Sequence, residues 1–177
     1  MTPNSPCLEL RPYSPGHLLA LVEGDEAFYR SFGVRTAEGL HAFYVGGQVS
    51  PHWLAQLRDA READVWKFGF AVLHRADGLV IGSAGFKGPP DPEGMVEAAY
   101  GIVPTFEGNG YATEALRELV SFAFNDPRVR VIRAHTLPAN NASARVLEKN
   151  GFSNLGEVID PEDGRVWRWE RTKNVTH

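Results

Sequence analysis

The sequence predicts one mixed α/β domain of the α+β type, and three features of the chain carry this prediction. A strand, a glycine-bearing loop and a helix follow one another in residues 95–124. An Asp-Gly pair at 77–78 separates two β-rich segments, 66–74 and 79–86, which is a strong hairpin signal. The length of 177 residues, of which 43% are hydrophobic, suits one globular domain with a full core.

The first half of the domain is expected to combine a strand with helical stretches. Residues 8–13 alternate apolar and polar side chains, as a strand does. Ser14-Pro15 marks a helix start, because proline suits the first helical position. Aromatic residues among glycines over 26–44 indicate a helical segment followed by a loop, and residues 50–63 predict another short helix.

The second half is expected to alternate strands and helices. Residues 95–103 are apolar and extended, and Pro104 ends this strand because it lacks a ladder donor. Apolar residues then recur at helical spacing from Ala112, and the Asn-Asp-Pro sequence at 125–127 stops that helix. The remaining expected elements are a strand at 129–136, a helix within 136–152 and a last hairpin formed by 153–159 and 165–171.

Composition limits the partners and the compartment. We expect a single domain over 1–177 with its core at about 8–171. The formal net charge of -4 and the lack of a basic block argue against a nucleic acid or an anionic membrane as partner. The lone Cys7 excludes an internal disulfide and fits a reducing cytoplasm. The N-terminus lacks signal-peptide features and no segment is long enough to span a membrane, so we expect a cytoplasmic protein.

The loop after the central strand has the features of a phosphate site. Gly108 and Gly110 can adopt backbone angles that are closed to other residues. Such a loop can turn successive N–H groups toward one point at the positive end of a helix dipole, although glycines here also form plain tight turns. Two familiar phosphate motifs do not fit. A Walker loop would end in Gly-Lys-Ser/Thr, and the dinucleotide fingerprint requires a small residue in place of Thr113.

A known family fits better. The sequence Glu-Gly-Asn-Gly-Tyr-Ala at 107–112 resembles the Arg/Gln-x-x-Gly-x-Gly/Ala motif of the GCN5-related N-acetyltransferase (GNAT) superfamily. Its continuation at 111–116 resembles the subgroup that acetylates the N-termini of ribosomal proteins, and 136–152 resembles the Asn-x-x-Ser…Gly-Phe helix of the same family. The resemblance runs from about 8 to 171 and is strong over 82–152. It implies the GNAT fold, with a central mixed, mostly antiparallel sheet of about seven strands flanked by about four helices.

The resemblance implies acetyl-CoA as cosubstrate and no metal ion. Glu107 departs from the motif, where Arg or Gln is usual, and we expect its carboxylate to point into solvent. The main chain of Ile102 and Val103 would run beside the pantetheine arm, and Asn140 would hydrogen-bond the same arm. The N–H groups expected to bind the pyrophosphate belong to Gly108, Asn109, Gly110, Tyr111, Ala112 and Thr113.

Glu97 is the candidate for the general base, acting directly or through water. Strand alternation puts Glu97 on the same face as Ala99 and Gly101, and these small residues leave room for an acceptor. The competing interpretation is a strand acid on a solvated edge or one paired with an arginine. Glu157 and the acidic turn at 162–163 are weaker candidates.

Ser143 is the candidate donor to the departing thiolate. Many members of the family have a tyrosine acid at the position of Leu147, so this chain needs another donor or none. Ser143 lies one helical turn after Asn140, at the start of a helix whose dipole would also stabilise negative charge. The competing interpretation is that Ser143 only caps or packs the helix start.

These residues predict an N-acetyltransferase that moves the acetyl group of acetyl-CoA to a primary amine by direct attack. The acceptor is left open between a protein N-terminal α-amine and a small amine such as an antibiotic or a polyamine. A homodimer is also left open. Tyr100 and Tyr111 are expected to pack, and His135 to be a hydrogen-bonded core histidine. The alternative function is a CoA-binding module with a sensor or structural role and no turnover.

Overall fold

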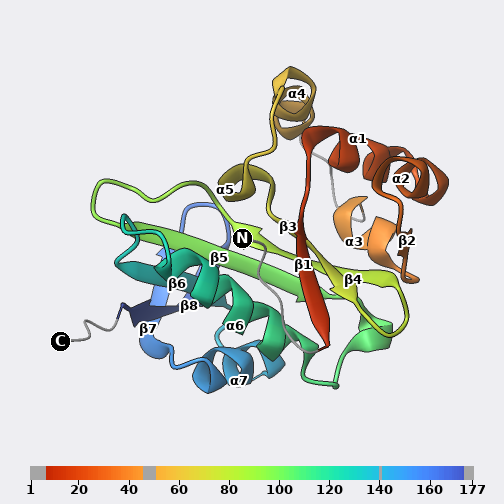
Figure 1. Ribbon diagram of the computed structural model, residues 1–177. Coiled ribbons are helices and arrows are strands. Elements are labelled where there is room, and N and C mark those ends of the chain that lie inside the picture. Colours follow the sequence, from red (N-terminus) through yellow and green to blue (C-terminus); the bar gives the residue numbers. More distant parts are fainter. Residues whose placement is uncertain (1–6, 46–50, 140, 174–177) are drawn as a thin grey trace.

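A computed structural model describes residues 7–45, 51–139 and 141–173 of the chain, and a single sheet organises them (Figure 1). The strands are β1 (Leu8–Pro12), β2 (Arg35–Thr36), β3 (Phe70–His74), β4 (Leu79–Phe86), β5 (Met95–Ile102), β6 (Val131–Thr136), β7 (Ser153–Asp160) and β8 (Gly164–Thr172). The helices are α1 (Pro15–Glu23), α2 (Asp25–Phe32), α3 (Leu40–Val45), α4 (Pro51–Asp59), α5 (Val65–Phe68), α6 (Tyr111–Phe124) and α7 (Ala142–Lys149), with a 3-10 turn at Pro104–Phe106.

The sheet is mixed and mostly antiparallel, which confirms the predicted fold class. Its strand order is β1-β3-β4-β5-β6-β8-β7, and β2 adds a short parallel pairing to β4. The other parallel pair is β5 with β6 at the centre of the sheet. The two-residue strand β2 raises the number of strands in this sheet to eight, one more than expected.

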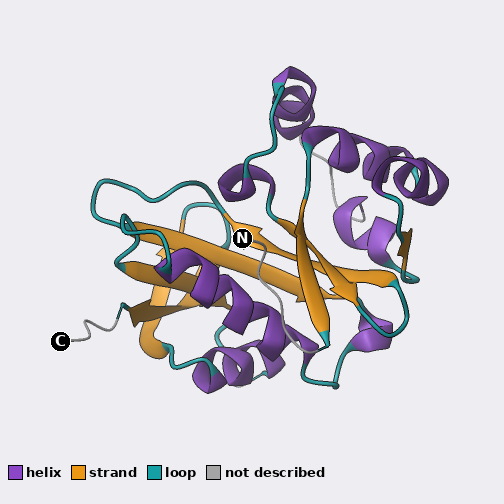
Figure 2. Cartoon of the chain, in the orientation of Figure 1, coloured by secondary structure: helices purple, strands orange, loops and turns teal. Residues whose placement is uncertain are grey.

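Helices cover both faces of the sheet (Figure 2). Every residue of β3 is buried, which requires cover on both sides. Figure 1 shows α6 lying across the sheet, and it shows α1, α2 and α4 grouped at the top and upper right of the molecule. The buried face of α6 is apolar and consists of Ala115, Leu116, Leu119, Val120 and Ala123.

The predicted strand over 66–74 is wrong at its start, because residues 65–68 form the short helix α5. The Asp64 side chain accepts the main-chain N–H of Trp66 at 3.0 Å and so caps the helix. Gly69 ends it with a φ of 72°, a conformation that favours glycine. Two local caps therefore override the β-rich composition of this segment.

The first helix, α1, begins with a reciprocal capping box. Ser14 Oγ accepts the main-chain N–H of His17 at 3.1 Å, and His17 Nδ1 accepts the main-chain N–H of Ser14 at 3.0 Å. The box fixes the point at which the chain leaves β1 and turns into α1. None of the helices in the described part of the chain is long and apolar enough to cross a membrane.

Candidate active site

The two parallel strands at the centre of the sheet separate along their length. β5 pairs with β6 only over Met95–Glu97 and Val131–Arg133, while β5 continues beside β4 to Ile102. The main-chain N–H of Lys87 donates to the Glu97 carbonyl, and that of Val103 donates to the Ile81 carbonyl. Because direction alternates along a strand, the main-chain groups of Tyr100 and Ile102 point away from β4, toward the side from which β6 has diverged.

A cleft of about 720 Å³ lies along this edge of β5. Its other walls come from the loop after β5, the first turn of α6 and one face of α7. The lining residues are Tyr100, Gly101, Ile102, Phe106, Glu107, Gly108, Gly110, Tyr111, Ala112, Thr113, Ala142, Ser143, Arg145, Val146 and Lys149.

Two glycines of the loop, Gly108 and Gly110, line the cleft. Gly108 and Gly110 have φ values of 80° and 81°. Gly110 is the N-cap of α6 and makes no side-chain cap hydrogen bond, so the first N–H groups of the helix need an external partner. A Cβ built on either glycine meets no atom within 4 Å, so it would extend into open space that a bound group can occupy. Asn109 shapes the loop, since its Nδ2 donates to the carbonyls of Phe106 and Glu107.

Two hydrogen bonds hold the walls of the cleft in place. The Tyr111 hydroxyl lies 2.9 Å from His74 Nε2, which ties the start of α6 to β3. Asn150 Nδ2 donates to the Thr113 carbonyl at 3.2 Å and joins the end of α7 to the first turn of α6. Tyr111, the first residue of α6, therefore makes a structural hydrogen bond and also lines the cleft.

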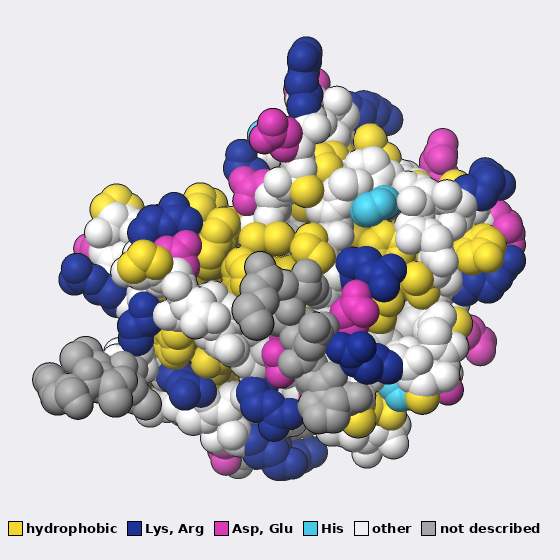
Figure 3. Space-filling view, in the orientation of Figure 1, with side chains coloured by type: hydrophobic (Ala, Val, Ile, Leu, Met, Phe, Trp, Pro, Cys, Tyr) yellow, Lys and Arg dark blue, Asp and Glu magenta, His cyan; other side chains and the backbone are white. Residues whose placement is uncertain are grey.

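Arg145 and Lys149 were missed in the sequence. They lie one turn apart on α7, are exposed and line the cleft opposite the glycine loop. Basic side chains also gather near α7 at the lower edge of the molecule in Figure 3. Glu107, the residue that departs from the family motif, is exposed at the same rim. The spacing of four between two basic residues on a helix is the signal that could have identified the pair.

Two predicted cofactor residues, Val103 and Asn109, are not part of the cleft lining. Val103 is fully buried outside the cleft lining, its N–H donates to the Ile81 carbonyl, and its own carbonyl accepts the N–H of Phe106. Ile102 alone of the predicted strand pair lines the cleft. Asn140 lies outside the described residues.

Glu97 lies in an adjoining cavity of about 180 Å³. Its Oε2 is 2.9 Å from Lys87 Nζ, so the carboxylate is paired with a lysine rather than with an arginine. Lys87 Nζ also lies 3.4 Å from Asp163 and 3.8 Å from Glu162, both in the turn between β7 and β8. Burial alone would lower the pKa of Lys87, but its hydrogen bond and attraction to Glu97, with help from Asp163, raise that pKa above its ordinary value.

The side chain of His135 is 5% exposed and is hydrogen-bonded, as predicted. Arg168 Nε donates to His135 Nε2 at 3.1 Å. Because an arginine can only donate, Nε2 must accept and the ring proton must lie on Nδ1. Nδ1 lies 3.4 Å from Glu97 Oε2, so the histidine turns a positive edge toward the carboxylate. Nδ1 donates no aligned hydrogen bond within the described residues.

Ser143 and Tyr100 line both the cleft and the Glu97 cavity. The cap of α7 is Asn141, whose side chain accepts the N–H of Ala144 at 3.0 Å, so Ser143 is not the helix cap. Leu147 is fully buried in the core. Burial raises the pKa of the Tyr100 phenol well above its usual range, so this group stays protonated. Tyr100 was expected only to pack. The strand pattern could not show that it lines both cavities.

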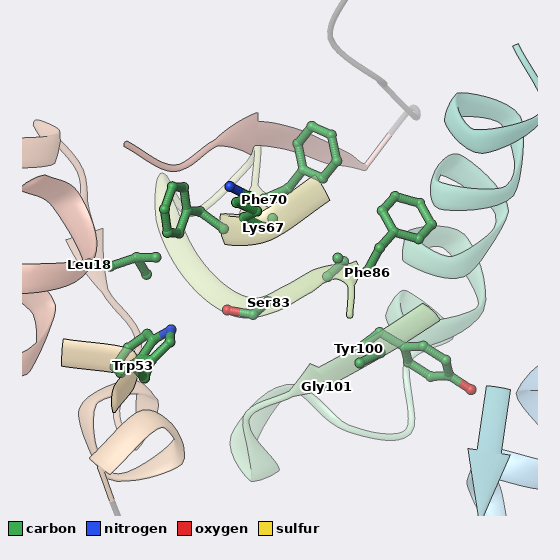
Figure 4. Close-up of a pocket in the computed structure, with 13 residues that line it drawn as sticks. Leu18, Trp53, Lys67, Phe70, Ser83, Phe86, Tyr100 and Gly101 are labelled. Carbon is green, nitrogen blue, oxygen red and sulfur yellow. The ribbon is translucent and has the colours of Figure 1, made fainter. Parts of the chain in front are cut away.

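A third hollow, of about 400 Å³, lies against β4 and β5 next to the cleft (Figure 4). Its floor is made of small residues in two direct cross-strand pairs, Ser83 with Gly101 and Gly85 with Ala99. By alternation, these four residues share a face with Glu97. Its walls include Leu18 of α1, Trp53 of α4, and Lys67 and Phe68 of α5.

The three hollows meet at the middle of β5. Tyr100 lines all three, Gly101 lines the cleft and the third hollow, and Ala99 lines the third hollow and the Glu97 cavity. A ligand anchored in the cleft by its anionic groups would thus reach a point flanked by Glu97 and Ser143. A second molecule can approach that point from the third hollow. This arrangement suits a group transfer between two bound molecules.

Comparison with known proteins gives a family. The model of the acetyltransferase (GNAT) domain matches residues 8–153. The chain is 34% identical over 73 residues to the uncharacterized N-acetyltransferase YjdG of Bacillus subtilis (strain 168), a match that covers 41% of this chain. The matches to YjdG and to two further curated relatives span 37% to 54% of the length of those proteins.

Two solved structures have a similar fold. One is aminoglycoside acetyltransferase AAC(6')-Ib in complex with coenzyme A, with a TM-score of 0.62 and 21% identity over 94% of this chain and 95% of the other. The second is the ribosomal-protein-S5-alanine acetyltransferase from Vibrio fischeri, with a TM-score of 0.66 and 16% identity over 97% and 96% of the two chains. At such identities the likeness concerns the fold alone.

Proposed function

Because this chain belongs to the GNAT acetyltransferase family, we propose that it transfers the acetyl group of acetyl-CoA to a primary amine. One observation carries the proposal. A cleft lined by the glycine loop, the start of α6 and two basic side chains ends beside a cavity that contains a carboxylate. The first part suits a phosphate-bearing cosubstrate, and the second suits removal of a proton from an amine.

In this proposal the glycine loop and the first turn of α6 bind the pyrophosphate through their N–H groups. Arg145 and Lys149 add positive charge for the phosphates from α7. The pantetheine arm lies along the free edge of β5, where Tyr100 and Ile102 offer main-chain donors and acceptors. The thioester then reaches the middle of β5, where the three hollows meet.

The chemical step is attack by the amine nitrogen on the thioester carbonyl carbon, which breaks the carbon–sulfur bond and forms an amide. The substrate ammonium first gives one proton to Glu97, directly or through water, and the neutral amine then attacks. The second proton, which the nitrogen loses as the amide forms, goes to water. The leaving thiolate receives a hydrogen bond from Ser143, which lines both adjoining cavities. Lys87 must leave Glu97 for the substrate ammonium to approach, and Asp163 and Glu162 remain nearby to hold it.

A second function is favoured by one contact. Lys87 already occupies Oε2 of Glu97 at 2.9 Å, which would suit a protein that binds CoA and does not turn over. The two functions differ in one measurement. A binding module would show acetyl-CoA binding without release of free CoA in the presence of any amine.

The test measures free CoA release with a panel of amines, using wild type, Glu97→Gln and Glu157→Gln. The Glu97 variant should lose roughly 10²–10⁴-fold in kcat with little change in acetyl-CoA affinity. Glu157 provides the matched control, because it is an exposed glutamate on β7 paired with Arg165 outside the cavities. Normal kcat in Glu97→Gln across the whole pH range would assign proton removal to another group.

A further inference from the structure

We propose that the third hollow, defined by its floor Ser83, Gly85, Ala99 and Gly101, binds an acceptor with a single primary amine on an uncharged, apolar body. This inference rests on the proposed acetyl transfer and adds the substrate class to it. An N-terminal residue of a peptide and a free arylalkylamine share this chemistry. A polyamine and an aminoglycoside do not, because each carries several charged amines.

The position of the hollow favours an acceptor site. It shares Tyr100 and Gly101 with the cosubstrate cleft, and it shares Ala99 with the Glu97 cavity. An amine entering from this side therefore passes over Ala99 before it reaches the carboxylate. The small residues of the floor leave space above the two strands for the body of the acceptor.

The charge of the lining argues against a polycation. Among the described residues that line the hollow there is no carboxylate, and the charged side chain that they include is Lys67. Each ammonium group that is taken from water needs a partner, and a second or third would find none in this lining. The adjoining cavity is lined by two carboxylates, Glu97 and Asp163, and by Lys87, which contacts both, so one negative charge is left for one amine.

Apart from Lys67, the walls of the hollow are apolar. Leu18 of α1 and Trp53 of α4 lie together on one side of the hollow (Figure 4), and Phe68 of α5 is also in its lining. A volume of about 400 Å³ is at the small end of ligand pockets and fits a ring or a short side chain.

One polar group in the floor lacks a partner. Ser83 Oγ is buried and makes no hydrogen bond within the described part of the protein. In Figure 4 its oxygen points toward the side of the hollow where Leu18 and Trp53 lie. A buried hydroxyl is normally hydrogen-bonded, so an acceptor that carries a carbonyl or hydroxyl beside its amine would satisfy it. An N-terminal residue has such a carbonyl.

The first experiment compares kcat/KM for L-phenylalaninamide, 2-phenylethylamine, a short peptide that begins with phenylalanine, spermidine and kanamycin. The kcat/KM values of the three apolar monoamines should exceed those of both polycations by about tenfold or more, because each polycation has at least one ammonium group without a partner in the lining. Equal or better use of spermidine or kanamycin would overturn the substrate class while leaving acetyl transfer intact. CoA release with none of the five amines would overturn the class as well. If acetyl-CoA also fails to raise the melting temperature, the proposed function itself fails.

The peptide separates two sources of the same chemistry. If the peptide and phenylalaninamide are used equally well, the acceptor is the N-terminus of a longer chain. If the peptide is rejected and both small amines are used, the acceptor is a free amine. Both results support a monoamine with an apolar body.

A second experiment tests the floor and the walls separately. Ser83→Ala should raise KM for phenylalaninamide by about threefold to tenfold and leave 2-phenylethylamine unchanged, because only the first amine carries a carboxamide. Ser121→Ala on the outer side of α6 is the matched control. Trp53→Ala should raise KM for both amines. Tyr29→Ala is the control, because Tyr29 is an exposed aromatic residue of α2 that does not line the hollow, and it should leave both KM values unchanged. Unchanged KM values in Ser83→Ala and Trp53→Ala would place the acceptor elsewhere.

Discussion

Lys87 Nζ lies 2.9 Å from Glu97 Oε2, and the main-chain N–H of Lys87 also donates to the Glu97 carbonyl across the β4–β5 hairpin. The proposed base is thus held by its own cross-strand neighbour. The lysine has two further carboxylates within 4 Å, so it can shift without losing all its partners. The ammonium of an incoming amine would compete with Lys87 for the same oxygen.

Replacing Lys87 tests this competition. Lys87→Met removes the cation beside a half-buried carboxylate, which favours the protonated carboxyl. The acid limb of the kcat/KM profile should therefore move to higher pH, and activity should fall most in mildly acidic buffer. Lys87→Arg keeps the charge and should keep the limb in place. Because Lys87 is partly exposed, the free energy of unfolding should change by less than about 1 kcal/mol. An unshifted limb in Lys87→Met would separate the ion pair from proton removal.

The α1 capping box predicts a pH dependence of stability. Burial, with a smaller effect of Arg11, lowers the pKa of His17 from its ordinary value of 6.5, and Nδ1 can accept from Ser14 only while unprotonated. Below pH 6.5 the unfolded chain therefore binds more protons at this residue than the folded one. The contribution of His17 should be complete above its ordinary pKa and should be lost as pH falls through its lowered pKa.

The variant His17→Gln separates this effect from general acid unfolding. Glutamine suits the same position of a capping box and does not titrate. Urea unfolding at a series of pH values should give a shallower loss of stability for His17→Gln than for wild type in the window just below pH 6.5. Parallel curves for the two proteins would contradict the prediction.

The glycine loop gives a prediction with a matched control. Gly110 and Gly78 both have positive φ values, of 81° and 62°, and a Cβ on either meets open space. Valine at each position should cost about 1–3 kcal/mol of backbone strain. Acetyl-CoA should raise the melting temperature of wild type and of Gly78→Val, because it binds only the folded state. It should not raise that of Gly110→Val, whose side chain would fill the approach to the N–H groups. An equal shift in both variants would remove the loop from the cosubstrate site.

Arg145 and Lys149 should contribute to cosubstrate affinity through charge. Both are exposed, so their effect is screened by salt. The double variant Arg145→Ala with Lys149→Ala should raise the Kd of acetyl-CoA by about tenfold at low ionic strength, and by less at high ionic strength. Glu148→Ala, on the same helix but outside the lining, should not weaken binding. A loss of affinity that does not depend on salt would indicate a packing effect instead.

The central strand, loop and helix could be predicted because each follows from local chemistry. Strand alternation put Glu97 on the face of Ala99 and Gly101, and the structure brings Glu97 and Ala99 to one cavity. The helix at 65–68 was missed because two caps decide it against its β-rich composition. Local composition is a weak guide where a side-chain cap and a glycine act together.

The partners of the site depend on long-range packing and could not be predicted. Lys87 faces Glu97 only because the proline-rich turn between β4 and β5 sets their register. Trp53 reaches the third hollow only because α4 packs beside α1. No periodic pattern in the sequence predicts either contact. The competing interpretation, that Glu97 is paired with an arginine, was right about an ion pair, but the partner is Lys87.

Asn141 and Ser143 allow the last prediction to separate turnover from stability. Asn141 caps α7, while Ser143 is exposed and lines both cavities that adjoin the proposed thiolate. Asn141→Ala should therefore lower the free energy of unfolding by about 0.5–2 kcal/mol. Ser143→Ala should leave that free energy nearly unchanged, because no cap bond is lost.

If Ser143 donates to the thiolate, Ser143→Ala removes an interaction that strengthens only as negative charge develops. Its cost should then appear in kcat, by about tenfold, and not in the Kd of acetyl-CoA. This is less than the 10²–10³-fold effect of the strongest oxyanion donors, because thiolate charge is diffuse. The measurement is kcat, Kd and unfolding free energy on both variants. Unchanged kcat in Ser143→Ala would leave the protonated Tyr100 phenol, which lines the same two cavities, as the next donor to test through Tyr100→Phe.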